Sequence, residues 1–66
     1  MKVKARMIIM SHLSDAQMCV GIENLKQANI NINFAKFLIL KYADMETEIN
    51  ADEEWEEFMT KHSNLV

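Results

Sequence analysis

The sequence predicts an all-α fold, in which a helical hairpin is followed by a short acidic helix. Half of the 66 residues are hydrophobic, proline is absent and glycine occurs once, which is unlike the composition of a disordered tail or a loop-rich fold. Apolar residues also recur at helical spacing through most of the chain. Because helix breakers are so rare, long uninterrupted helices are the expected outcome.

The first helix is expected over residues 3–20. Its inner face is apolar for about five turns. The residues of this face are Ala5, Ile8, Ile9, His12, Leu13, Ala16, Cys19 and Val20. Gly21 is well placed to end the helix as a left-handed C-cap. The opposite face is apolar too, since it carries Val3, Met7, Met10 and Met18.

A strand over residues 2–10 is the alternative for the start of the chain. Apolar residues at positions 3, 5, 7 and 9 alternate there with Lys2, Lys4 and Arg6, as in a half-buried strand. Ile8 and Met10 then break the alternation. The continuous helix is favoured because its apolar face persists much further along the chain.

The second helix is expected over residues 24–43 and has two apolar faces. The first face consists of Leu25, Ala28, Ile32, Ala35, Ile39 and Ala43. Its alanines would let a neighbouring helix approach closely. The second face, about 120° around the helix axis from the first, consists of Ile30, Phe34, Phe37 and Leu38. One neighbouring helix cannot cover both faces.

Residues 44–50 are predicted to be a polar linker, followed by a third helix over residues 51–62. Asn50 is an acceptable N-cap, with Glu53 in the capping-box position. Acidic residues in the first turn favour the positive end of the helix dipole. The apolar side of this helix consists of Ala51, Trp55, Phe58, Met59 and His62.

The chain is short enough to form one domain, spanning residues 1–66, with a thin core. Domains of this size usually need a disulfide, a metal or a partner chain for stability. The single cysteine, Cys19, excludes an internal disulfide and fits a reducing compartment. Neither a leader peptide nor a membrane-spanning segment is expected. We therefore expect a cytoplasmic protein that is stabilised by a partner and does not bind a membrane.

Charge is divided unevenly along the chain. Residues 1–43 hold six of the seven basic residues and two of the ten acidic residues, and the remaining residues carry the surplus of acid. The net charge of −3 makes nucleic acid an unlikely partner. The acidic run in residues 52–57 is interpreted as a solvated helix face, although Trp55 and Phe58 within it would suit docking into an apolar groove with a basic rim.

No catalytic, cofactor-binding or metal-binding residues are predicted. His12, Asp15 and Cys19 share a helical spacing that could approach one metal ion, but a structural zinc site needs four ligands. A packed histidine is the better interpretation. Ser11 and Ser14 flank His12, yet adjacent helical residues point in different directions, so neither is poised for nucleophilic catalysis. The sequence predicts that the protein is not an enzyme.

A protein interface is predicted on the apolar surfaces that one copy cannot bury. Large exposed apolar patches are rare on monomeric proteins. Methionine side chains also adapt well to irregular contact surfaces. The predicted interface residues are Ile30, Phe34, Phe37, Leu38, Met7, Met10, Met18, Trp55 and Phe58. We expect a homo-oligomer, most simply a dimeric four-helix bundle. It would act as an adaptor that modulates a larger, unidentified protein, as bacterial or phage accessory proteins do.

The strand alternative leads to a different function. With a strand over residues 2–10, the order strand, helix, helix resembles the ribbon–helix–helix repressors, over residues 1–43. That resemblance implies a dimer whose paired strands lie in the DNA major groove, with Lys2, Lys4 and Arg6 toward the DNA. Ile8 and Met10 would also face DNA, and the acidic helix would repel phosphate.

Overall fold

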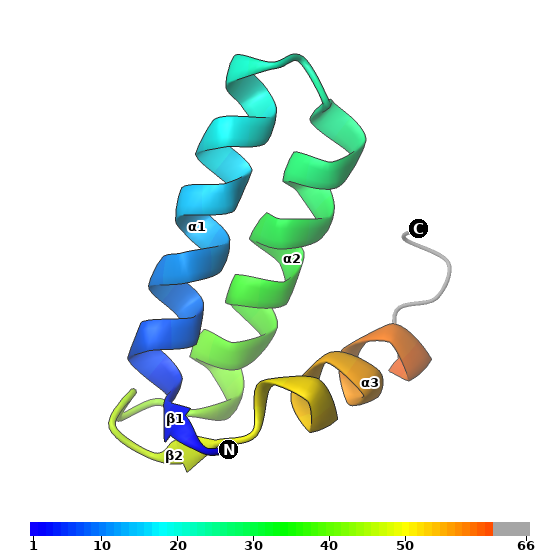
Figure 1. The fold of residues 1–66 in the computed structure, drawn as a ribbon. Helices are drawn as coiled ribbons and strands as arrows, with labels where there is room; N and C mark the ends of the chain where they lie inside the picture. Colours follow the sequence, from blue (N-terminus) through cyan, green and yellow to red (C-terminus); the bar gives the residue numbers. More distant parts are fainter. Residues whose placement is uncertain (62–66) are drawn as a thin grey trace.

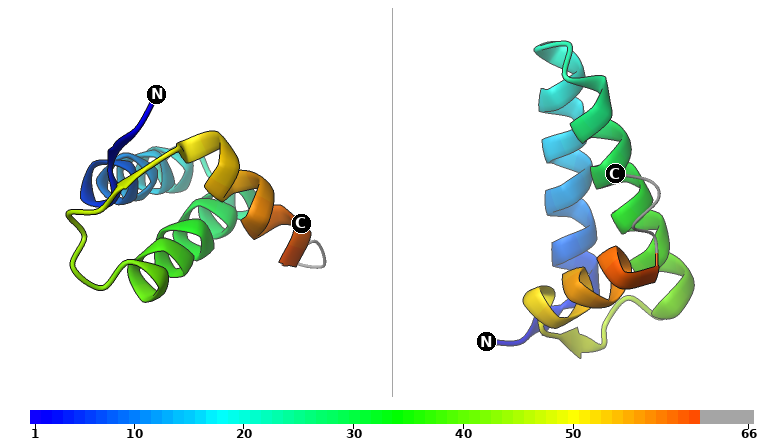
Figure 2. Two further views of the ribbon diagram at one scale, coloured as in Figure 1. Left: turned by 90° about the horizontal axis from the view of Figure 1, so that it is seen from below. Right: turned by 90° about the vertical axis from the view of Figure 1, so that its right-hand side faces the viewer.

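The computed structural model describes residues 1–61, and most of them are helical. The elements, in chain order, are β1 (Val3–Lys4), α1 (Ala5–Gly21), α2 (Leu25–Lys41), β2 (Glu48–Ile49) and α3 (Ala51–Lys61). Helices α1 and α2 lie side by side as a hairpin, and α3 crosses one side of it near the end that holds both short strands (Figures 1 and 2). The predicted hairpin and short third helix are confirmed, while dimerisation stays a prediction.

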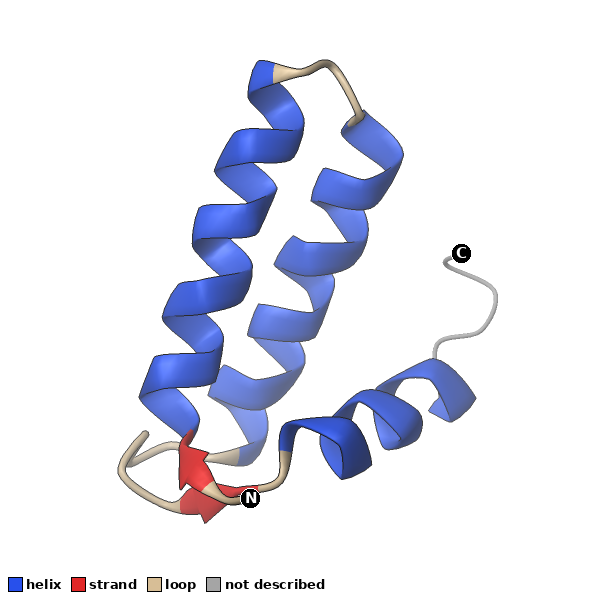
Figure 3. Cartoon of the chain, viewed as in Figure 1, coloured by secondary structure: helices blue, strands red, loops and turns tan. Residues whose placement is uncertain are grey.

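Helix α1 begins two residues later than predicted because the linker holds its first residues. Strands β1 and β2 pair antiparallel, with Val3 opposite Ile49 (Figure 3). The backbone amides of Ala5 and Arg6 then donate to the carbonyl oxygens of Thr47 and Met45, both at 2.9 Å. Amides of a first helical turn lack intrahelical acceptors, so residues 45–47 cap α1 from across the fold.

The strand predicted as the alternative for residues 2–10 is therefore limited to Val3–Lys4. Residues 5–10 belong to α1, and the two-residue strand pairs within its own chain. The ribbon–helix–helix arrangement requires this segment to pair with a second chain as an extended strand. The described structure does not have that arrangement.

The turn between α1 and α2 is closed by a Schellman motif in which glutamate, not glycine, is left-handed. Glu23 has a φ of 62°, and Gly21 is an ordinary helical residue. The amide of Asn24 donates to the carbonyl of Cys19 at 2.7 Å, and that of Glu23 to Val20 at 3.0 Å, as the motif requires. The prediction of a left-handed Gly21 cap is wrong, because the chain continues to Ile22 before it turns.

Helix α2 has a polar cap at its start and ends two residues before the predicted boundary. The side chain of Asn24 accepts from the amide of Gln27 at 3.3 Å. After α2 the amide of Met45 donates to the carbonyl of Tyr42 at 2.9 Å, closing a tight turn with Met45 at a φ of 62°. This turn replaces the last helical residues expected from the sequence.

The linker is polar, as predicted, but it is ordered by its own side chains. One oxygen of Asp44 accepts from the amide of Glu46 at 3.1 Å and from the hydroxyl of Thr47 at 3.1 Å. These hydrogen bonds, that of Thr47 first, lower the pKa of Asp44. Asp44 therefore shapes the loop whose carbonyl groups cap α1.

Helix α3 begins as predicted. The side chain of Asn50 accepts from the amides of Asp52 and Glu53 at 3.0 and 3.3 Å, which confirms it as the N-cap. The structure describes α3 as far as Lys61. His62, which was assigned to the apolar side of this helix, lies outside the described residues.

The core is centred on Phe34, a residue of α2 that is 1% exposed. Its ring contacts His12 of α1 at 4.7 Å between centroids, and Trp55 and Phe58 of α3 at 5.0 and 5.3 Å. The three helices therefore meet on one aromatic side chain. Small residues, including Ala5, Ala28 and Ala35, are buried elsewhere in the hairpin, and side chains this small let α1 and α2 approach closely.

Candidate functional site

The side of the hairpin opposite α3 carries a strip of exposed apolar side chains. Positions seven residues apart share one side of a helix, so each helix contributes one row. The strip, which we call the open face, consists of Leu13, Val20, Leu25, Ile32 and Ile39, which are 36–65% exposed. On α1, Leu13 and Val20 are separated from His12 by the buried residues Ile9 and Ala16. His12 is the residue of α1 that contacts Trp55 of α3. Figure 2 shows that α3 lies on only one side of the hairpin.

Small buried residues separate the two rows of the open face. Ala16 lies beside the α1 row, and Ala28 and Ala35 lie beside the α2 row; all three are at most 4% exposed. The open face therefore consists of two rows of larger side chains with small side chains between them, and we call this line of alanines the seam. Ridges and grooves of this kind are the units from which helix packing is built.

Four predicted interface residues belong instead to the core of this chain. Ile30, Phe34, Leu38 and Phe58 are each at most 7% exposed. Helix α3 supplies the cover that the sequence analysis assigned to a partner. These four side chains cannot contact a second protein in this conformation, and placing them on an outer surface was wrong.

The other five predicted interface residues are at least partly accessible. Phe37 and Trp55 are partly buried and pack against the core. Met7, Met10 and Met18 lie on the outer side of α1 and are 56–70% exposed. The structure therefore separates the nine residues into a buried group, a core margin and an exposed methionine row on α1. It does not bring them together on one surface.

A network of ionic hydrogen bonds, which we call the latch, holds α3 on the hairpin. The ammonium group of Lys41, at the end of α2, donates to Glu54 at 2.9 Å and to Glu57 at 2.8 Å. The hydroxyl group of Tyr42 donates to the other oxygen of Glu54. Glu54 is only 8% exposed, so these partners satisfy a charge that would be costly to bury alone.

The latch shifts the protonation equilibria of its members. Hydrogen bonds to Glu57 and then to Glu54 raise the pKa of Lys41. Burial, followed by donation to Glu54, raises the pKa of Tyr42. Donation from Lys41 and then Lys61 lowers the pKa of Glu57. These shifts favour the charged forms of Lys41 and Glu57 and the neutral form of Tyr42.

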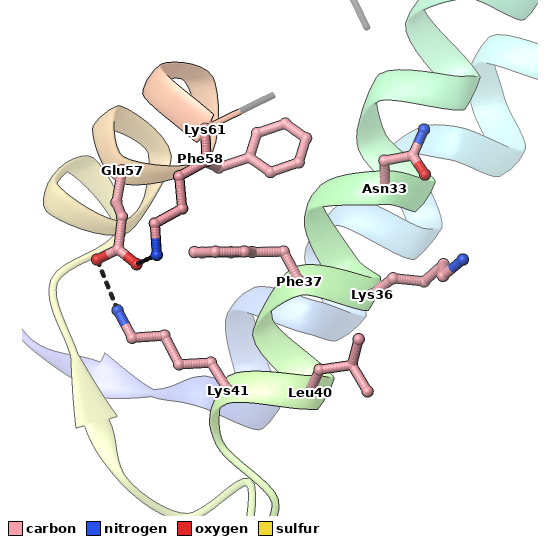
Figure 4. A pocket seen from close by; sticks show the side chains of 8 residues that line it. All are labelled: Asn33, Lys36, Phe37, Leu40, Lys41, Glu57, Phe58 and Lys61. Carbon is pink, nitrogen blue, oxygen red and sulfur yellow. Dashed lines mark hydrogen bonds and ion pairs between the residues drawn. The ribbon is translucent and has the colours of Figure 1, made fainter. Parts of the chain in front are cut away.

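A groove of about 530 Å³ lies between α2 and α3. Its lining residues are Asn33, Lys36, Phe37, Leu40, Lys41, Glu57, Phe58 and Lys61. Figure 4 shows the ring of Phe37 between the two helices, with the ammonium groups of Lys41 and Lys61 directed at Glu57. Leu40, 81% exposed, lies on the α2 side of the groove. The groove therefore combines apolar surface with a mainly cationic rim.

A buried amide links α1 and α2 near the middle of the hairpin. The side-chain oxygen of Asn31 is 2.9 Å from Nδ1 of His12, and its nitrogen donates to the sulfur of Cys19 at 3.9 Å. These hydrogen bonds connect both His12 and Cys19 to Asn31, and the imidazole packs against Phe34 and Trp55.

The geometry of residues 1–61 does not support a metal site at His12, Asp15 and Cys19. Within this range no three histidine, cysteine, aspartate or glutamate side chains lie close enough to hold a metal ion. The partner of His12 and Cys19 is the Asn31 amide, and not Asp15. In the same part of the chain, no helix has both the length and the apolar character that crossing a bilayer would demand.

The basic residues at the start of the chain face the linker. Lys4 and Arg6 lie 3.4 and 3.6 Å from Glu46. All three side chains are about half exposed, so these ion pairs contribute little to stability. They do reduce the positive charge that a DNA-binding strand would present.

Sequence reasoning missed the latch and the open face for different reasons. The latch joins residues 13 and 16 positions apart, a separation for which helical periodicity gives no signal. The open face was visible as the first apolar face of the second helix, but all of that face was expected to pack on the first helix. Ala28 and Ala35 of that face are buried, whereas Ala43 is exposed and the three large side chains are at least one-third exposed.

Comparisons with protein-family models, with curated proteins and with solved structures found no match. The geometry of the chain is therefore the basis for the function proposed below.

Proposed function

We propose that this chain is a small non-enzymatic interaction protein that acts as a homodimer formed through the open face. The observation that carries this proposal is the strip of five exposed leucine, isoleucine and valine side chains along both hairpin helices. Contiguous apolar patches of this kind are characteristic of interaction surfaces. No part of residues 1–61 covers it.

A second copy is the occupant that best fits the shape of the open face. The ridges of one hairpin can fill the alanine-lined seam of another, and a twofold axis makes each contact occur twice. Two hairpins paired in this way form a four-helix bundle, with each α3 on the outside. Charge does not oppose the pairing, because all five side chains of the strip are uncharged.

The expected dimer is reversible. Covering one half-exposed leucine or isoleucine contributes about 1 kcal/mol, so ten such side chains from two copies contribute about 10 kcal/mol. This gain is of the same order as the entropy cost of association. Dissociation on dilution is therefore expected, together with thermal stability that increases with protein concentration.

The methionine row of α1 lies outside this dimer and is available to another protein. Met7, Met10 and Met18 lie on the side of α1 that faces away from α2. Methionine side chains adapt to irregular partner surfaces. The proposed adaptor role assigns the open face to self-association and the methionine row to a larger protein.

Sedimentation equilibrium of the wild type and of Ile32→Glu tests the self-association. We expect the wild type to approach twice the chain mass as concentration rises and Ile32→Glu to remain at the chain mass, because a carboxylate cannot be buried in the seam without a partner. Ser14→Glu is the matched control, since it adds the same charge at an exposed position on the other side of α1.

Circular dichroism separates loss of association from loss of folding. Ile32 is 41% exposed, so Ile32→Glu should keep the helical spectrum of the wild type at concentrations where both are monomeric. A wild-type protein that stays monomeric at millimolar concentration contradicts the proposal. So does an Ile32→Glu protein that dimerises as strongly as Ser14→Glu.

A further inference from the structure

The groove between α2 and α3 has features that neither the latch nor the proposed dimer accounts for. It lies beside α3, and Lys36 at its outer edge borders the open face, because Lys36 is four residues from Ile32 and three from Ile39 on α2. Its volume of about 530 Å³ lies within the usual range of small-molecule sites, roughly 300–1,000 Å³. Leu40 lines it while remaining 81% exposed, and Lys36 has no ion pair within residues 1–61.

The charge around the groove favours a ligand with a single negative charge. The lining residues include three lysines and one glutamate. Lys41 also contacts the carboxylate of Glu54. Three lysines and two glutamates together carry one net positive charge. A monoanion would balance that charge, whereas a polyphosphate or an acidic helix would bring surplus negative charge close to Glu57.

The apolar part of the groove favours a ligand with a hydrocarbon body. Phe37, Leu40 and Phe58 line it, and the stems of the lysines add further methylene groups beneath their charged ends. Lys61 lies at the α3 rim, where it contacts Glu57 at 3.2 Å, and Lys36 extends outward from the α2 rim (Figure 4). At either rim a charged group can remain hydrated while its tail lies between the helices.

From these observations we propose that the α2–α3 groove binds a monoanionic amphiphile, of which a medium-chain fatty acid is the simplest representative. The tail would contact Leu40 and Phe37, and the carboxylate would lie at the cationic rim. No covalent step is involved. The proposal is independent of self-association, because the groove and the open face share no residue.

Titration with dodecanoate below its micelle concentration tests this proposal, and dodecanol is the uncharged comparison. Trp55 is the only tryptophan, and its ring lies 5.7 Å from that of Phe58, so its fluorescence should report on ligand in the groove. We expect saturable binding of dodecanoate with one site per chain and weaker binding of dodecanol. Calorimetry provides a second measurement of the stoichiometry.

Two variants locate the binding site. Lys36→Gln combined with Lys61→Gln removes both charges and keeps most of each stem. It should weaken dodecanoate binding about fourfold or more, since loss of each exposed charge pair lowers affinity roughly two- to fivefold, and should leave dodecanol binding unchanged. Leu40→Asn should weaken both ligands. The matched controls are Lys26→Gln and Ile22→Asn, which change exposed residues outside the groove.

Several results would overturn the proposal. These are absence of saturable binding, equal affinity for dodecanoate and dodecanol, or retention of wild-type affinity by the Lys36, Lys61 double variant or by Leu40→Asn. The groove substitutions alter exposed side chains, so circular dichroism should confirm folding for each variant. Leu13→Glu, which places a charge in the open face on α1, should bind dodecanoate like the wild type, which separates this site from the open face.

Discussion

The two sides of the α1–α2 hairpin differ in what covers them. On one side, Phe34 and Leu38 lie beneath α3 and the residues after α2, and neither is more than 1% exposed. On the other, Ile32 and Leu25 are 41% and 65% exposed. Both sides are rich in large aliphatic or aromatic residues. Hydrophobicity therefore does not distinguish the core of this protein from its proposed interface.

The difference shows how a short amphipathic segment selects the core of a small protein. The aromatic side chains of α3, Trp55 and Phe58, pack against Phe34, and the latch fixes α3 where those rings meet. Because α3 has one apolar side, it covers one side of the hairpin and leaves the other side exposed. The uncovered side is the surface that we assign to self-association.

The largest predicted effect tests the covered side. Phe34→Ala should lower the free energy of unfolding by about 3–5 kcal/mol, because it leaves a cavity where the three helices meet. That loss approaches the whole stability expected of a core this size. At monomeric concentration, Ile32→Ala should cost less than about 1 kcal/mol, since its side chain is already partly hydrated. Urea unfolding followed by circular dichroism measures both.

Phe34→Leu provides an intermediate point, because it retains much of the buried volume and should remain folded. The comparison of the two sides fails if Ile32→Ala destabilises the monomer as much as Phe34→Ala does. That result would mean that the open face is buried within one copy in solution.

A smaller effect is expected at alkaline pH, where the latch can be opened without mutation. Tyr42 is neutral in the latch and its pKa is raised above 10.0, so its stabilising contribution is complete below pH 10 and is lost as the pH rises through the raised value. Ionisation removes its donation to Glu54 and places two negative charges together. The melting temperature should fall by about 4–8 °C from this group alone, the shift made by roughly 1 kcal/mol.

Tyr42→Phe isolates this contribution, because it lacks the ionising hydroxyl and keeps the ring. Lys41 stays charged over the same interval, since its pKa is raised as well. Thermal melts between pH 8 and 12 should show a steeper decline for the wild type than for Tyr42→Phe. Parallel declines would indicate that the phenol does not help to hold α3.

An effect of similar size and opposite sign is expected at the turn, outside both sides of the hairpin. Glu23 is held at a φ of 62°, which costs an L-residue with a side chain roughly 1–2 kcal/mol. Glu23→Gly should therefore raise the free energy of unfolding by about 1 kcal/mol, without changing dimerisation or dodecanoate binding. Chemical denaturation of this variant measures the gain.

Glu23→Ala is the appropriate control, because it removes the same charge and retains the Cβ atom. It should show no such gain. If Glu23→Ala and Glu23→Gly stabilise the protein equally, the effect comes from charge, and the left-handed conformation is not the cause.

Local sequence signals were accurate where the physics is local. The hairpin, the short third helix and the cap at Asn50 could be predicted because periodicity and capping depend on residues a few positions apart. Gly21 shows the limit of this approach. The chain passes two residues further and turns at Glu23, because a Schellman closure can impose the left-handed conformation on a residue other than glycine.

Contacts between segments that are distant in the sequence could not be predicted from periodicity or capping. The start of α1 depends on carbonyl groups of Met45 and Thr47, about 40 residues later in the chain, and the covered side of the hairpin depends on α3. Periodicity shows that residues such as Phe34 and Ile32 are apolar and lie on a helix. Which of them is buried depends on which neighbour lies against that helix, and this was settled only when the aromatic rings and the latch placed α3 on one side.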